Sequence, residues 1–96
     1  MQNFQFRGLE VQNISFYRGK LHNVLILRVY PSSNKRVRTR LILRVVMDTD
    51  HVEIVGGKHI NQGSTVSGWG YLTDVDTNKP IKELFISIKR IKIDRR

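Results

Sequence analysis

The chain has 96 residues with 17 Lys and Arg against 8 Asp and Glu, and it contains no cysteine. This length allows one domain, and the lack of cysteine excludes disulfides, thiolate metal sites and cysteine catalysis. The net charge of +9 is typical of a chain that binds a polyanion, and without a signal-peptide segment or an apolar run long enough to span a bilayer we expect a cytoplasmic protein.

Apolar and polar residues alternate along most of the chain, which predicts strands. We expect five of them, over residues 4–16, 23–30, 36–47, 64–72 and 82–93. In the first strand the alternation shifts by one residue at Gly8, as is typical of a β-bulge. Residues 17–20 are expected to form a turn, and the polar segments 31–34 and 73–80 are expected to be loops.

Residues 48–62 follow this alternation least. Asp50 is a helix-capping residue type and predicts a short helix over 51–55, which Gly56 and Gly57 would end within two turns. Five strands with an irregular insertion between the third and fourth is the element order of an all-β, five-stranded Greek-key OB-fold barrel. An SH3-like barrel and a small sandwich have similar patterns and stay open as alternatives.

The third strand concentrates positive charge on one face. Its arginines that share that face are Arg36, Arg38, Arg40 and Arg44. Alternate residues of a strand lie about 7 Å apart, a spacing comparable to that of phosphates along an extended single strand. Guanidinium groups bind phosphate through paired hydrogen bonds. A solvated outer face is the alternative interpretation, although such faces normally mix charges of both signs.

Aromatic residues are expected beside this basic face. On the second strand, Arg28 and Tyr30 face outward if Leu25, Leu27 and Val29 face the core. On the fourth strand, Trp69 and Tyr71 share the outer face, and Gly68 and Gly70 on the inner face suit a tightly curved barrel. Exposed rings near a basic surface are typical of a platform for stacking unpaired bases. For Trp69, burial in a homo-oligomer interface is an equally strong alternative.

Residues 63–72, GSTVSGWGYL, resemble the G-S-x-V-x-V-x-G-x-L segment of the bacterial single-stranded DNA-binding proteins. Gly68 replaces the usual valine and Trp69 the usual acid. Residues 4–9 and 84–93 are similar to the opening and closing strands of that family. The chain ends in Arg95-Arg96 in place of the acidic tail of many members, and so is more similar to the PriB-like, dimeric OB-fold members. The resemblance implies an OB barrel that binds single-stranded DNA.

A second resemblance concerns residues 68–72, which are similar to the G-[FY]-G-F-I core of the RNA-binding motif in cold-shock domains. It implies the same stacking role for Trp69 and Tyr71, with RNA as the ligand. The sequence carries no catalytic constellation, metal-ligand motif or phosphate-binding loop, so we expect neither an enzyme nor a bound cofactor or metal. Membrane binding is disfavoured because the basic residues lie on strands.

We therefore expect a protein that binds single-stranded DNA with little sequence preference, as a dimer or tetramer. The expected phosphate contacts are Arg28, Arg36, Arg38, Arg40 and Arg44, with Lys79 and Lys82 extending the track. The expected stacking residues are Tyr30, Trp69 and Tyr71. RNA as the ligand, and an acidic protein partner docking on the same basic face, are the alternatives.

Overall fold

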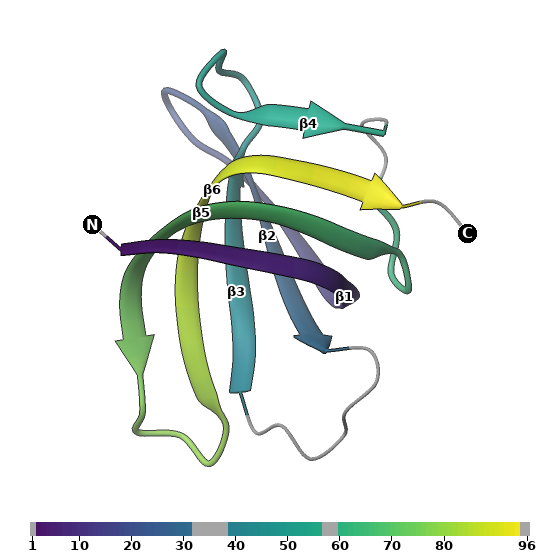
Figure 1. The fold of residues 1–96 in the computed structure, drawn as a ribbon. Helices are drawn as coiled ribbons and strands as arrows, with labels where there is room; N and C mark the ends of the chain where they lie inside the picture. Colours follow the sequence, from purple (N-terminus) through teal and green to yellow (C-terminus); the bar gives the residue numbers. More distant parts are fainter. Residues whose placement is uncertain (1, 32–38, 57–59, 95–96) are drawn as a thin grey trace.

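The computed structural model describes residues 2–31, 39–56 and 60–94 and consists of strands joined by turns (Figure 1). The strands are β1 (Gln2–Arg18), β2 (Asn23–Pro31), β3 (Thr39–Val46), β4 (Glu53–Val55), β5 (Thr65–Asp76) and β6 (Lys82–Asp94). Within these residues there is no helix. All strands except β4 correspond to strands predicted from the sequence.

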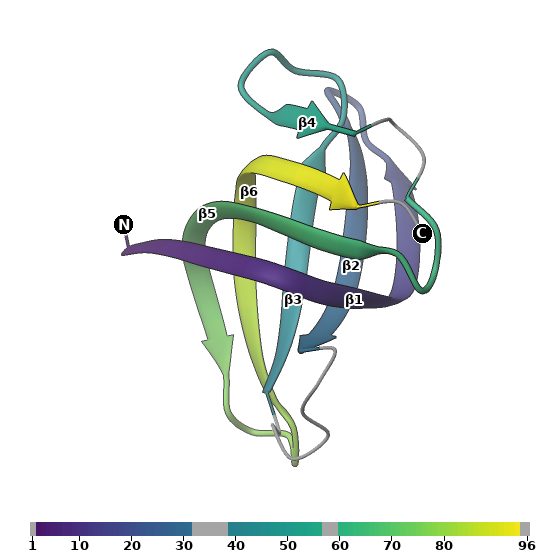
Figure 2. The ribbon, with the colours of Figure 1, turned by 45° about the vertical axis from the view of Figure 1, so that its right-hand side comes forward.

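Five strands close into a barrel. They pair in the order β3-β2-β1-β5-β6, and β3 also pairs with β6. The closing β3–β6 pair is parallel, whereas the other pairs around the ring are antiparallel. β4 lies outside the ring, at the top in Figures 1 and 2, and pairs in parallel with the C-terminal part of β6. This is the five-stranded mixed barrel expected for an OB fold, with one extra strand.

β1 changes phase at Gly8, as predicted. Phe6 pairs with Gly68 and Leu9 pairs with Val66, so the register shifts between them, yet Phe6 and Leu9 are both buried in the core. Gly8 has a φ of 61°, in the left-handed region that favours glycine. β1 pairs with β5 as far as Glu10 and with β2 from Leu9 onward, so Leu9 and Glu10 pair on both sides.

The core fills the barrel with side chains from alternate positions of the five ring strands. Its buried members are Phe6, Leu9, Val11, Leu25, Leu27, Val29, Leu41, Leu43, Val45, Val66, Ile86, Ile88, Ile91 and Ile93. The inward orientation predicted for the second and third strands is therefore confirmed. A β-carbon at Gly68 or Gly70 would lie only 2.0 or 2.1 Å from a carbonyl oxygen of β6. Both glycines thus allow β5 to curve closely against β6.

The short helix predicted over residues 51–55 is wrong. Residues 53–55 form β4 instead, and pair with Arg90–Lys92 of β6. Ile54 and Val55 are β-branched and suit a strand. A helix of five residues makes too few internal hydrogen bonds to form stably, whereas the edge of β6 offers a ladder of backbone partners.

Two predicted loops are shorter than expected. Tyr17 and Arg18 belong to β1, and the turn after them is closed by the Gly19 amide donating to the His22 carbonyl oxygen at 3.0 Å. Residues 73–76 continue β5 and pair with the start of β6. Their polar composition indicated a loop, but β6 supplies them with ladder partners. The predicted strand segment 36–38 lies outside the described residues.

Candidate nucleic-acid interface

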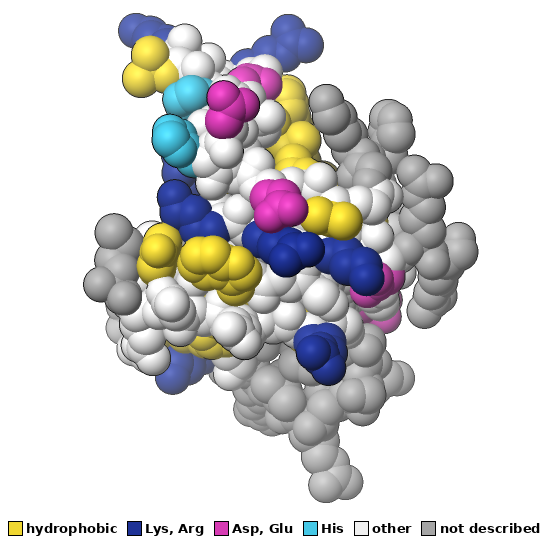
Figure 3. Space-filling view, turned by 45° about the horizontal axis from the view of Figure 1, so that its top comes forward, with side chains coloured by type: hydrophobic (Ala, Val, Ile, Leu, Met, Phe, Trp, Pro, Cys, Tyr) yellow, Lys and Arg dark blue, Asp and Glu magenta, His cyan; other side chains and the backbone are white. Residues whose placement is uncertain are grey.

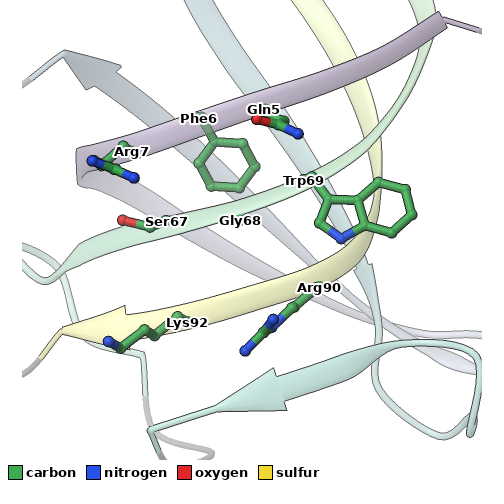
Figure 4. A pocket seen from close by; sticks show the side chains of 8 residues that line it. All are labelled: Gln5, Phe6, Arg7, Ser67, Gly68, Trp69, Arg90 and Lys92. Atoms are coloured by element: carbon green, nitrogen blue, oxygen red, sulfur yellow. The ribbon is translucent and has the colours of Figure 1, made fainter.

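A hollow of about 480 Å³ lies on the outer face of β1, β5 and β6, and we call it the Trp69 hollow. Its lining residues are Gln5, Phe6, Arg7, Ser67, Gly68, Trp69, Arg90 and Lys92. Trp69 pairs with Gln5 on one side and Arg90 on the other, and Ser67 pairs with Lys92. Directly paired residues point to the same face of a sheet, so these side chains stand together. Figure 4 shows Trp69 and Arg90 at one end and Arg7 and Lys92 toward the other.

The Trp69 hollow is positively charged. Arg7, Arg90 and Lys92 are all exposed. The acid nearest to them in the described ion pairs is Glu53 of β4, whose carboxylate lies 3.6 Å from Arg90 Nε, and the two side chains are 62% and 52% exposed. An ion pair this exposed is worth little and leaves the guanidinium accessible. Figure 3 shows Lys and Arg side chains gathered next to hydrophobic ones on this face.

Two aromatic rings extend the surface beyond the hollow. Trp69 and Tyr71 are both partly exposed, and their rings meet edge to face with centroids 5.7 Å apart. The ammonium group of Lys89 lies 5.8 Å from the centre of the Tyr71 ring. Trp69 is therefore not sealed in the core of the monomer, and its ring borders both the cations of the hollow and a second ring.

An outward row connects the hollow with the basic face predicted on the third strand. Tyr71 pairs with Ser87, Ser87 with Arg44, and Arg44 with Ile26, so these side chains follow one another across β5, β6, β3 and β2. With about 4.8 Å between neighbouring strands, the row spans about 14 Å of backbone. Arg44 is exposed, as predicted.

A second, smaller hollow of about 270 Å³ lies where β1, β2 and β3 meet. It is lined by Gln12, Asn13, Arg28, Tyr30 and Arg40. Three of these residues were predicted from the sequence to contact the ligand. The Arg40 guanidinium lies over the Tyr30 ring, 5.2 Å from its centroid, and its Nε donates a hydrogen bond to the Tyr30 hydroxyl. Arg28 and Arg40 thus come together with Tyr30, as the alternation predicted.

Two of the cations that were expected to contact phosphate form ion pairs with the buried carboxylate of Glu83. Glu83 is 4% exposed and accepts from Arg40 Nη1 at 3.4 Å and from Lys79 Nζ at 2.7 Å. The arginines of the third strand were expected to have no acid among them, but this acid comes from β6. Arg40 and Lys79 are therefore ion-pair partners of Glu83 within the barrel. Lys82 is exposed, while Arg36 and Arg38 lie outside the described residues.

Sequence reasoning missed three cations of the Trp69 hollow. Arg7, Arg90 and Lys92 come from two strands at opposite ends of the chain, and only the register of β5 between them brings them to Trp69. A signal was present, because Ile91 and Ile93 are buried and their alternation places Arg90 and Lys92 on the outer face. The partner strand could not be identified from that alternation.

No family model, no curated protein and no solved structure matches this chain. Across the part of the chain that the structure describes, no three His, Asp or Glu side chains come close enough together to hold a metal ion. The same residues include no helix with the length and apolar character that crossing a membrane requires.

Proposed function

We propose that this protein binds single-stranded DNA with little sequence preference, using the Trp69 hollow and the adjoining Tyr71 as its main contact surface. The observation that carries the proposal is the arrangement of a partly exposed indole beside three exposed cations in one hollow. Unpaired bases stack on aromatic rings, and a positively charged groove follows the backbone between them. The +9 net charge favours the same class of ligand.

The two kinds of contact make separate contributions. Stacking of one base on Trp69 contributes about 1–3 kcal/mol and is tolerant of sequence, because every base has a flat face. Each neutralised phosphate contributes roughly −0.7 to the slope of log affinity against log salt on single strands. Arg7, Arg90 and Lys92 together therefore contribute about −2. Arg44 extends the track along the outward row, and Arg28 of the second hollow extends it on β2.

The test is a titration of fluorescent dT oligomers over a salt series, followed by anisotropy and by the emission of Trp69, which is the single tryptophan. Trp69→Ala is expected to weaken binding about 5- to 150-fold, while Trp69→Phe keeps a ring and most of the affinity. Arg7→Ala and Lys92→Ala are each expected to flatten the salt slope by about 0.7.

Lys82→Ala is the matched control. The sequence placed Lys82 on the track, but Lys82 is an exposed cation at the other end of β6, outside the Trp69 hollow. If it flattens the slope as much as Lys92→Ala, overall charge carries the binding and the hollow does not. An unchanged affinity of Trp69→Ala together with a smaller oligomer would place the indole in a subunit interface. Parallel titrations with rU oligomers and with an acidic peptide test the RNA and protein alternatives. The proposal includes a cytoplasmic location, where nucleic acid is present.

A further inference from the structure

The tip of the hairpin formed by β1 and β2 exposes large apolar side chains. Phe16 is 53% exposed, Tyr17 57% and Leu21 88%, and they are three of the four exposed large hydrophobic residues within the described segments. Three large apolar side chains exposed within six residues at one hairpin tip suit an interaction surface. The Trp69 hollow does not include any of them.

The hairpin tip is held in a defined shape. The Gly19 amide donates to the His22 carbonyl oxygen at 3.0 Å, and a β-carbon at Gly19 would lie 2.4 Å from that oxygen. Where the turn meets β2, the Asn23 amide donates to Asp48 Oδ2 at 2.9 Å. The Met47 amide donates to the Asn23 carbonyl oxygen, also at 2.9 Å. The tip is therefore a fixed projection anchored to the end of β3.

The two rings point to opposite faces of this projection. Phe16 pairs with Leu25, whose side chain is buried in the barrel, and Tyr17 pairs with Val24 on the other face. Adjacent residues of a strand alternate between faces. A partner on one side of the hairpin covers only one ring. A single partner that covers both rings therefore passes on both sides of the hairpin, with Leu21 between its two arms.

The charge of the tip favours an anionic partner. Arg18 at the end of β1 and Lys20 in the turn are both exposed. The acid that the described hydrogen bonds place at this hairpin is Asp48, which accepts from the Asn23 amide. A branched polyanion with flat, stackable groups on each arm is a nucleic-acid fork. Aromatic and aliphatic side chains are the residue types that proteins insert between bases.

We propose that the hairpin tip is a wedge that enters the fork where a duplex opens into two single strands. Leu21 meets the last base pair, Phe16 and Tyr17 each stack on the first unpaired base of one strand, and Arg18 and Lys20 contact phosphates. This inference rests on the proposed function, because it requires a protein that binds unpaired strands.

The fold places the wedge where one arm of the fork reaches the Trp69 hollow. The hairpin tip and β4 lie at the same end of the barrel (Figures 1 and 2). β4 borders the hollow, since Glu53 pairs with Arg90. In the proposed complex, one strand leaves the wedge over this end and passes β4 toward Arg90 and Trp69.

The test compares the affinity of the full chain for three labelled DNAs: a dT oligomer, a blunt duplex, and a fork with two dT arms. The fork is expected to bind at least about fivefold tighter than the dT oligomer, the lower limit for one additional stacked base. Leu21→Ser and Tyr17→Ser are expected to remove this preference and leave dT affinity unchanged. Val75→Ser is the matched control, because Val75 is an exposed apolar residue outside the hairpin, and it should change neither affinity.

Circular dichroism confirms that each variant is folded before binding is compared. Equal affinity for fork and dT oligomer overturns the wedge, as does an equal loss on both DNAs in Leu21→Ser. A smaller oligomer in the hairpin variants, with fork preference retained, assigns the tip to a second copy of the chain and also overturns it. If Trp69→Ala leaves dT affinity unchanged while the hairpin variants still lose fork preference, the Trp69 hollow fails and the wedge stands.

Discussion

Substitution of the buried Glu83 tests how much its ion pairs contribute to stability where β3 meets β6. Glu83 accepts from Arg40 at 3.4 Å and from Lys79 at 2.7 Å, and is 4% exposed. The substitution Glu83→Gln keeps the shape of the side chain and removes its charge. We expect the variant to be less stable, because the partly buried guanidinium of Arg40 loses its counter-ion.

The size of the effect follows from the exposure of the partners. Removing one member of a fully buried ion pair costs roughly 3–5 kcal/mol, whereas an exposed pair is worth up to about 1 kcal/mol. Glu83 is buried, but the side chains of Arg40 and Lys79 are 28% and 59% exposed. The expected cost therefore lies between these limits, at about 2 kcal/mol. In a domain of this size, that lowers the Tm by roughly 8–16 °C.

Thermal unfolding followed by circular dichroism measures the shift. Glu53→Gln is the control, because its ion pair with Arg90 joins two exposed side chains at 3.6 Å, and it should cost less than about 1 kcal/mol. If both variants melt at the same temperature, burial does not strengthen the Glu83 cluster and the reasoning is wrong.

Three further changes test the barrel by urea unfolding. Gly68→Ala places a β-carbon 2.0 Å from a β6 carbonyl oxygen, and the variant is expected to lose several kcal/mol of stability or not to fold. Gly8→Ala meets open space and should cost about 1–2 kcal/mol of stability for its left-handed φ. Equal losses would show that the close approach of β5 to β6 does not limit the residue at position 68. Leu43→Ala in the core should cost about 2–5 kcal/mol of stability, and Val75→Ala at an exposed position under about 1 kcal/mol. Similar values for the two variants would contradict the inward orientation of the Leu43 side chain on β3. Tyr30→Phe removes the acceptor of Arg40 Nε and should cost about 1 kcal/mol, so an unchanged midpoint would argue against that hydrogen bond.

Much of the fold follows from alternation alone, because one buried face imposes a period of two on each strand. The bulge at Gly8 was visible as a shift in that period, and the structure gives it a positive φ and a register change. The helix predicted over residues 51–55 was wrong because residues 53–55 pair with a strand that is distant in the sequence. The partners of β4 are residues 90–92, and the sequence around Asp50 gives no sign that the edge of β6 is available for pairing.

The candidate interface was predictable to the extent that its residues share a strand. Trp69 and Tyr71 were expected together two residues apart, and their rings are in contact. The pairing of Arg40 with Glu83 was not expected, because 43 positions separate these residues and the parallel β3–β6 register alone sets them opposite each other. Charge segregation along a sequence therefore does not imply charge segregation on a closed barrel, where every strand acquires two neighbours.

The glycines on either side of Trp69 link the closure of the barrel to the hollow. Gly68 and Gly70 let β5 approach β6 more closely than any side chain would permit. Glycines within a strand often mark a tight bend at a barrel corner, and the β5–β6 register shifts next to Trp69, between Trp69 and Gly70. Trp69 occupies that position, between the edge of the Tyr71 ring and the hollow. A substitution that relaxes the close approach of β5 to β6 at Gly68 and Gly70 should therefore weaken the proposed binding of single strands together with stability.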